Sequence, residues 1–137
     1  MRYLLDANVL IARTVPDHVH HDRCRFWLRG VDHIAACPIT EGALARYLVN
    51  TGTSAAQAVA VIHSLAKMPA YEFWPDTLSY GDADLRRVTG YKQVTDAYLA
   101  NLVQTHRDSQ LATLDEGLAT LYPDDVLLIP ELPSTPS

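Results

Sequence analysis

Five short apolar runs recur along the chain, separated by longer stretches of mixed polarity. Each run spans three to five residues and is bounded by Pro, Asp or Gly, a pattern that favours strands because turn-forming residues end them. The predicted strands are 3–5, 33–36, 71–74, 110–114 and 126–129.

The stretches between these runs show helical periodicity. Ala58, Val61 and Leu65, for example, repeat at the three- to four-residue spacing that places side chains on one helix face. Gly52 predicts a hairpin turn between two of the helices. The predicted helices are 18–29, 41–50, 54–67, 81–87, 94–105 and a short one at 115–121.

Strands that alternate with helices indicate an α/β fold with a mainly parallel sheet. The chain of 137 residues fits one domain, which we assign to residues 1–129. The remaining residues, 130–137, contain three prolines and two serines and predict a disordered tail.

Composition narrows the function classes. No run approaches the ~18 apolar residues of a membrane helix, and an acid at Asp6 comes too early for a signal peptide, so we expect a cytoplasmic protein without a membrane partner. Cys24 and Cys37 are too few for a disulfide framework or a zinc site, and their apolar surroundings predict buried free thiols. The net charge of −5 argues against broad, charge-driven nucleic-acid binding, although bound divalent cations can reverse the local sign of an acidic site.

Acidic residues follow the predicted strands. Asp6 comes directly after the first strand, Glu41 follows the second beyond Pro38, and Asp115 follows the fourth. Asp96 stands where a helix is predicted to begin. Ligands of open parallel sheets bind beyond the carboxyl ends of the strands, so we expect these four acids to line one crevice.

Each acid also has a simpler interpretation. Asp6, Asn8 or Asp96 can cap the helix that follows it, and Glu41 suits a first helical turn. Asp115 suits a turn. Their shared position at one predicted edge is what favours a functional site.

Four carboxylates in one crevice repel one another, so without a cation some are expected to stay protonated. A divalent cation removes that cost. Magnesium typically takes one or two carboxylates, keeps several waters and accepts phosphate oxygens. The pattern therefore favours metal-assisted phosphodiester hydrolysis with one ion, or with two about 3.5–4 Å apart.

Four segments carrying these acids resemble the PIN-domain family, and within it the VapC-type toxins of bacterial toxin–antitoxin pairs. Leu5-Asp6-Ala7-Asn8-Val9-Leu10 is similar to the opening of the family, and Thr40-Glu41 to its second acid. The segments 94–100 and 111–115 are similar to the third and fourth. The ordered set spans nearly the whole chain, from residue 3 to about residue 129.

The resemblance implies a three-layer α/β/α fold with a five-stranded parallel sheet, and an endoribonuclease that depends on Mg²⁺, with Mn²⁺ as a substitute. It implies a homodimer and a VapB-type antitoxin whose C-terminal segment blocks the site while its N-terminal part binds operator DNA. The acids that it implies for catalysis and metal binding are Asp6, Glu41, Asp96 and Asp115, supported through hydrogen bonds by Asn8 and Thr113. Asp6, Asp96 and Asp115 would be the main ligands, and Glu41 would bind the metal or orient the attacking water.

One departure from the family pattern concerns the last acid. Many relatives carry an additional acid about two residues beyond it, whereas here Glu116 follows Asp115 immediately and Gly117 comes next. A contribution of Glu116 to a second metal is left open.

Several other residues allow two interpretations. Arg13, Arg46 and Arg107 lie near the motifs in sequence and either hold flanking RNA phosphates or form surface ion pairs. Trp27 and Trp74 lie in apolar runs and are expected in the core. The apolar stripes of the helices around Gly52 form either an antitoxin or dimer groove or ordinary core packing, and the histidines at 18, 20 and 21 suit a solvated helix start.

Two other functions would use parts of the same pattern. Asp6-Ala7-Asn8 superficially resembles the Asp-x-Asp of haloacid-dehalogenase-like phosphatases, but Asn8 replaces the second acid and no convincing catalytic lysine follows a later strand. The other rival is a catalytically silent PIN-like module that binds RNA or protein. The presence of all four acids favours the enzyme.

Overall fold

The computed structural model describes residues 1–134, which form five strands and six α-helices in alternation. None of the helices in this range is both long and apolar enough to cross a membrane. The strands are β1 (Arg2–Leu5), β2 (His33–Ala36), β3 (Tyr71–Phe73), β4 (Ser109–Thr113) and β5 (Val126–Leu128). The helices are α1 (Ala7–Thr14), α2 (His21–Leu28), α3 (Pro38–Asn50), α4 (Ala55–Leu65), α5 (Val94–Gln104) and α6 (Glu116–Leu121).

All strand pairs are parallel, and the strand order is β3-β2-β1-β4-β5. The chain therefore builds the sheet outward from β1 through β2 to β3, and then returns to the other side of β1 for β4 and β5. This reversal makes the β1/β4 boundary the topological switch point, the place where open α/β sheets bind ligands.

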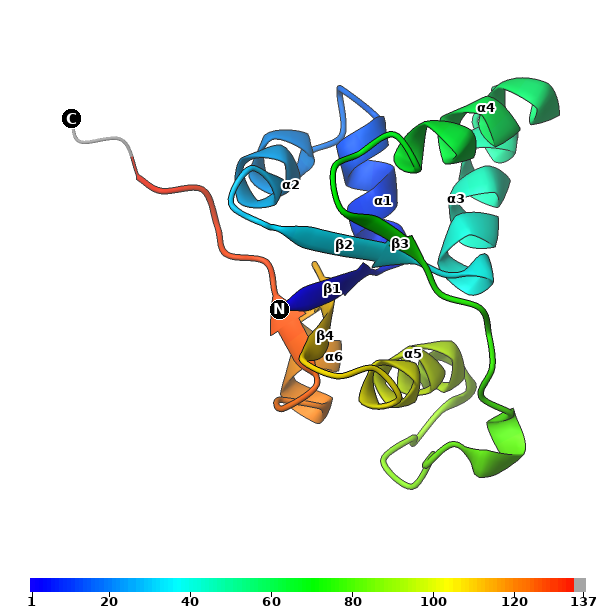
Figure 1. Cartoon of the computed structure of the whole chain (residues 1–137), viewed down its shortest axis with the longest axis vertical. Coiled ribbons are helices and arrows are strands. Elements are labelled where there is room, and N and C mark those ends of the chain that lie inside the picture. Colours follow the sequence, from blue (N-terminus) through cyan, green and yellow to red (C-terminus); the bar gives the residue numbers. More distant parts are fainter. Residues whose placement is uncertain (135–137) are drawn as a thin grey trace.

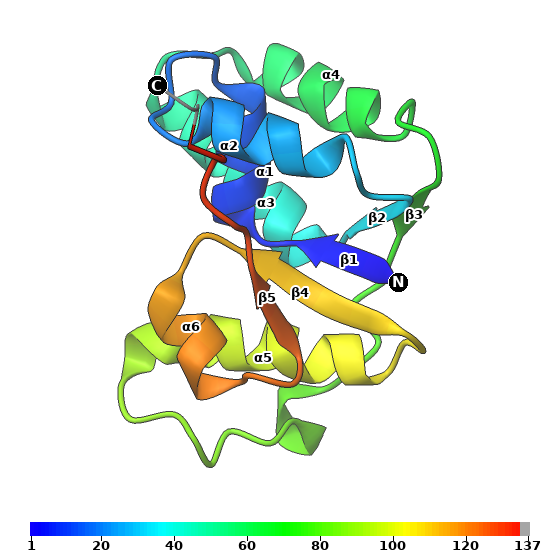
Figure 2. The same cartoon turned by 90° about the vertical axis from the view of Figure 1, so that its left-hand side faces the viewer.

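The sheet separates two helical layers, with α1 to α4 on one face and α5 and α6 on the other (Figures 1 and 2). Successive side chains of a strand point to opposite faces of the sheet, and both faces are covered by helices. Leu4 packs in the core beneath α5 and α6, whereas its neighbour Leu5 packs in the core beneath α1 to α4. The predicted three-layer α/β/α fold with a five-stranded parallel sheet is confirmed.

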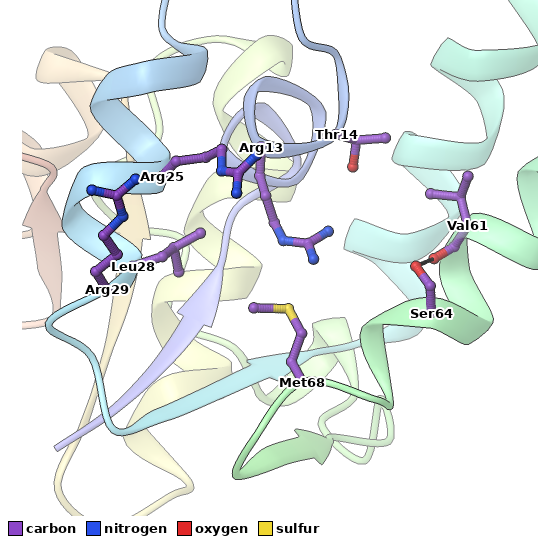
Figure 3. A pocket seen from close by; sticks show the side chains of 8 residues that line it. All are labelled: Arg13, Thr14, Arg25, Leu28, Arg29, Val61, Ser64 and Met68. Carbon is purple, nitrogen blue, oxygen red and sulfur yellow. Dashed lines mark hydrogen bonds between the residues drawn. The ribbon is translucent and has the colours of Figure 1, made fainter.

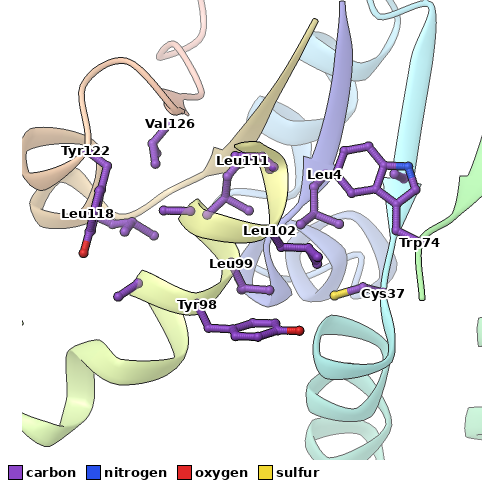
Figure 4. Close-up of a cluster of buried hydrophobic side chains, with 14 residues drawn as sticks. Leu4, Cys37, Trp74, Tyr98, Leu99, Leu102, Leu111, Leu118, Tyr122 and Val126 are labelled. Atoms are coloured by element: carbon purple, nitrogen blue, oxygen red, sulfur yellow. The ribbon is translucent and has the colours of Figure 1, made fainter. Parts of the chain in front are cut away.

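The core on the α5 side is built around one almost fully buried helix (Figure 4). Tyr98, Leu99 and Leu102 of α5 pack against Leu4 and Leu111 of the two central strands, and all five side chains are buried. This packing fixes α5, and hence the acid in its first turn, against the strands that carry the other acids.

The predicted buried positions are confirmed. Cys24 and Cys37 are buried free thiols. Trp74 is buried and stacks on His106 at a centroid distance of 3.6 Å, and the partly buried Trp27 packs edge-on against a tyrosine.

Two helix predictions differ from the structure. The predicted helix at 81–87 is wrong, because only a single 3-10 turn forms at Tyr80–Asp82. The structure also adds a helix that the periodicity did not single out, α1, which buries Val9, Leu10 and Ala12. The predicted turn is confirmed at Gly52, whose φ of 104° lies in the region that glycine tolerates.

The predicted C-terminal tail begins in contact with the domain. The buried guanidinium of Arg23 donates to the carbonyl oxygens of Ile129 and Pro130, and its Nη1 lies 3.2 Å from a carboxylate oxygen of Glu131. Residues 135–137 of the predicted tail lie outside the described residues.

Candidate active site

Asp6 and Thr113 meet at the carboxyl edge of the two central strands. Asp6 follows β1 directly and caps α1, with its Oδ1 accepting from the Ala7 amide at 2.8 Å. Thr113 ends β4 and donates its hydroxyl to Asp6 Oδ2 at 2.7 Å. The Asp6 side chain is thus held from two sides, and the residue is only 6% exposed.

The supporting residues form a network around the Thr113 hydroxyl. Thr113 Oγ1 accepts from Asn8 Nδ2 at 3.2 Å and from the Asp115 amide at 3.1 Å. Asn8 Oδ1 in turn accepts from the Leu114 amide at 3.2 Å. Because these bonds join the start of α1 to the end of β4, the predicted supporting roles of Asn8 and Thr113 have a direct geometric basis.

Asp115 lies beyond β4 and caps α6, with its Oδ1 accepting from the Leu118 amide at 3.1 Å. It is exposed, so its second carboxylate oxygen is open to a ligand. Glu116 begins α6 and is also exposed.

Asp96 stands in the first turn of α5, in the same helical layer as α6, which Asp115 caps. The α1 helix, which Asp6 caps, lies on the other face of the sheet (Figures 1 and 2). Burial raises the pKa of Asp96 to about 6, and the charges of Asp6 and Asp115 add to this rise. The Asp96 carboxylate therefore shares the electrostatic field of both other aspartates.

The pKa of Asp6 is also raised. Burial is the main cause, the hydrogen bonds from Thr113 and Ala7 oppose it, and the charge of Asp115 adds to it. No Lys, Arg or His in residues 1–134 forms an ion pair with Asp6, Asp96 or Asp115. The three aspartates thus form a concentration of negative charge without a protein cation to compensate it.

Glu41 stands apart from the three aspartates electrostatically. It lies in the first turn of α3, beyond β2, and its Oε2 accepts from the Tyr71 hydroxyl at 3.4 Å. Burial raises the pKa of Glu41, the Tyr71 hydrogen bond opposes this, and the charge that raises it further is that of Asp76. The structure therefore brings Asp6, Asp96 and Asp115 together, while Glu41 belongs to a neighbouring group on the β3 side.

Tyr71 and Asp76 are the residues of this edge that the sequence analysis missed. Tyr71 is in β3, and its hydrogen bond and charge contact with Glu41 help to raise the tyrosine pKa to about 12, after burial as the first cause. Asp76 follows β3 just as the other acids follow their strands, and that rule would have found it. The pairing of Tyr71 with Glu41 joins residues 30 positions apart and has no sequence signal.

The donor set of the three aspartates fits a magnesium ion. All the donors are carboxylate oxygens, which suit a hard divalent cation. A bound cation would neutralise the negative charge that, after burial, adds to the raised pKa values of Asp6 and Asp96. No group of three His, Cys, Asp or Glu side chains among residues 1–134 is arranged to hold a metal ion. Magnesium keeps several waters and typically uses only one or two carboxylates, so it needs no set of three protein ligands.

Two of the singled-out arginines and two of the histidines lie away from the aspartates. Arg107 precedes β4, at the amino edge of the sheet, and Arg13 stands at the far end of α1 from Asp6. His18 Nδ1 accepts from a backbone amide in a half-buried turn, and His21 Nδ1 lies 2.7 Å from the Ala12 carbonyl oxygen. These histidines hold the turn before α2.

The fold and the aspartate group define the class of protein. The PIN domain model matches residues 3–122, and the chain belongs to the PIN-domain family. Within that family it is similar to VapC-type proteins of Mycobacterium tuberculosis. It is 52% identical over 131 residues to "Ribonuclease VapC29", covering 95% of this chain and 98% of the relative.

Two further relatives from the same organism are more distant. "Ribonuclease VapC44" is 37% identical over 128 residues, covering 87% of this chain and 89% of the relative. "Ribonuclease VapC38" is 35% identical over 125 residues, covering 86% and 88%. The similarity to VapC-type proteins thus extends along nearly the whole length of the chain.

Substitutions of Thr113 test whether its hydroxyl group positions the Asp6 side chain. We expect Thr113→Val to lower the activity proposed below about 10- to 100-fold, because losing a hydrogen bond that orients a metal ligand typically has that effect. The acidic limb of the pH–rate profile should also move to higher pH, since the Thr113 hydroxyl lowers the pKa of Asp6. Thr113→Ser keeps the hydroxyl and should restore both properties. A Val variant with the rate and pH profile of the Ser variant would rule out this positioning role.

Proposed function

We propose that this protein is a magnesium-dependent endoribonuclease that hydrolyses RNA phosphodiester bonds, with Mn²⁺ as an effective substitute. The observation that carries the proposal is the group of Asp6, Asp96 and Asp115 at the switch point of the sheet. Two carboxyl pKa values are raised there, and no cationic side chain of residues 1–134 forms an ion pair with the group. Membership of the PIN-domain family and the similarity to proteins named ribonucleases support the same activity.

In the proposed hydrolysis, different residues bind the metal, orient its ligands and accept a proton. Asp6, Asp96 and Asp115 would hold the ion, with Thr113 and Asn8 keeping Asp6 in a single orientation. When bound, magnesium supplies Lewis acidity that favours attack by water on the phosphate and stabilises the negative charge of the transition state. Glu41, whose pKa is raised by burial, would accept a proton from the attacking water or orient it.

The similarity to VapC-type proteins also suggests protein partners. We propose that the protein acts as a toxin neutralised by a VapB-type antitoxin and that it forms a homodimer. The exposed apolar side chains of Val49 on α3 and Val59 on α4 support the presence of a protein contact on this side of the molecule.

The test is cleavage of total cellular RNA by the purified, antitoxin-free protein. Discrete fragments are expected with Mg²⁺ or Mn²⁺, and EDTA should abolish them. Stoichiometric cognate antitoxin should also stop cleavage. Ca²⁺ at equal concentration is a matched control, because it prefers more ligands and a looser geometry than magnesium. Intact RNA under all conditions, from protein shown by circular dichroism to be folded, would favour the silent binding module instead.

A further inference from the structure

Three arginines surround a pocket in the helical layer formed by α1 to α4. The pocket has a volume of about 480 Å³ and lies between α2 and α4, with the end of α1 between them. Arg13 comes from α1, and Arg25 and Arg29 come from the end of α2. Figure 3 shows Arg13 and Arg25 beside each other, with Val61 and Ser64 of α4 across the gap.

Within residues 1–134, these three arginines have no anionic partner. Among residues 1–134, no carboxylate lies within ion-pair distance of any of them, and none donates a hydrogen bond to a protein acceptor. Arg2, Arg23 and Arg86, by contrast, each pair with a carboxylate. In a chain with a net charge of −5, this pocket is a local concentration of unpaired positive charge.

The pocket is also lined by a buried hydroxyl group without a hydrogen-bond partner among the described residues. The Thr14 hydroxyl is buried and has no hydrogen-bond partner within the described range, which is uncommon for a buried polar atom. Burial lowers the pKa of the Arg13 guanidinium, and the charge of Arg25 lowers it further. An anion between the arginines would relieve this repulsion and give the hydroxyl an acceptor.

A role at the helix ends accounts for only part of this arrangement. Arg13 and Arg25 stand in the last turns of their helices, where a positive charge interacts favourably with the helix dipole. That interaction is weak at an exposed site and needs no pocket. It leaves the N–H donors of the guanidinium groups without acceptors among the described residues.

We propose that this pocket binds the phosphate group of a nucleotide or of an RNA chain. A guanidinium presents a planar fork of donors that matches phosphate oxygens, and three of them suit an anion with several oxygens better than a single carboxylate. The apolar wall of Leu28, Val61 and Met68 can pack against the sugar or base attached to the phosphate.

The pocket is separate from the candidate active site. Arg13 lies seven residues beyond Asp6 on the same helix, which corresponds to about 10 Å along the helix axis at 1.5 Å per residue. An RNA phosphate held there would therefore belong to a nucleotide other than the two that the cleaved bond joins. The RNA source rests on the proposed function, whereas binding of a free nucleotide does not.

The experiment measures binding in EDTA, so that neither metal nor cleavage contributes. Adenosine monophosphate is titrated by calorimetry, and a labelled 12-nucleotide single-stranded RNA by fluorescence anisotropy at several salt concentrations. The test variant is Arg13→Gln/Arg25→Gln, with Arg25→Gln/Arg29→Gln as a second pair should Arg13 be needed for folding. The matched control is Arg86→Gln/Arg107→Gln, which removes the same charge on the side of the sheet covered by α5.

Two results support the site and distinguish the source of the phosphate. Weaker RNA binding by about 10-fold, with a salt slope smaller by ~0.7 for each lost contact, assigns it to RNA. Loss of nucleotide binding alone assigns it to a free nucleotide. Unchanged binding of both probes, or equal loss in the control pair, would overturn the proposal. Because RNA cleavage in Mg²⁺ is measured separately, failure of the phosphate site is distinguishable from failure of the nuclease proposal.

Discussion

Replacing Asp6 by Asn is expected to reduce RNA cleavage by about 10³-fold or more while leaving the protein folded. Metal ions supply several kcal/mol of transition-state stabilisation, and each 1.36 kcal/mol corresponds to a factor of ten in rate. Asp6 is the most buried of the three aspartates and the one that the Thr113 network holds in place. An amide at this position is neutral and binds a hard cation far more weakly than a carboxylate.

The fold should tolerate the same substitution. Asn caps helices about as well as Asp, so the hydrogen bond from the Ala7 amide to residue 6 can be kept. The amide places an N–H group opposite the Thr113 hydroxyl, and removal of a buried charge offsets this cost. We expect the melting temperature to change by no more than about 4 °C.

The control for Asp6→Asn is Asp124→Asn. Asp124 is exposed and lies between α6 and β5, so the substitution removes the same charge away from the candidate site. Cleavage is measured with the RNA fragments that the unaltered protein produces, and folding by thermal denaturation. Equal activity in the two variants would remove Asp6 from the site.

Replacing Asp96 by Asn is expected to abolish cleavage and yet to stabilise the metal-free protein near neutral pH. The folded-state pKa of Asp96 is about 6, above its ordinary value of 3.8. The folded protein therefore binds this proton more tightly than the unfolded chain does. The associated stability is fully present below pH ~4 and is lost as the pH rises to about 6.

The expected gain is about 1 kcal/mol at pH 7 in EDTA. The full pKa difference would give more, but Asp96 is partly exposed and water screens part of its interaction with the other carboxylates. The unaltered protein and the Asn variant should be equally stable near pH 4, where Asp96 is protonated. Mg²⁺ should reverse the order at pH 7, because the ion binds the folded unaltered protein more strongly than the variant.

The measurement is chemical denaturation of both proteins at pH 4, 5, 6 and 7, with EDTA and with Mg²⁺. The difference between the two proteins isolates Asp96 from other titrating groups, including Asp84, whose lowered pKa acts in the opposite direction. A stability difference that does not change between pH 4 and pH 7 would contradict the position given to Asp96 beside two other carboxylates.

The strands and most of the helices could be predicted from local pattern, because each strand is a short apolar run that both helical layers bury. The α1 helix could not, since eight residues form a marginal helix that depends on packing Val9, Leu10 and Ala12 into the core. For residues 81–87 the local pattern predicted a helix that the structure lacks. These residues favour a helix locally, but most of them are exposed, and little burial is available to support a helix there.

The sequence by itself indicated that Asp6, Glu41 and Asp115 follow strands and that Asp96 opens a helix, and it predicted that all four would gather at the carboxyl edge of a parallel sheet. Strand order was decided only by the tertiary structure. Because β1 lies between β2 and β4, the acid after β2, Glu41, is separated from the acid after β4 and joins Tyr71 and Asp76 instead. The arginine pocket is likewise a product of packing, since residues on two different helices become neighbours only when both helices cover the same face of the sheet.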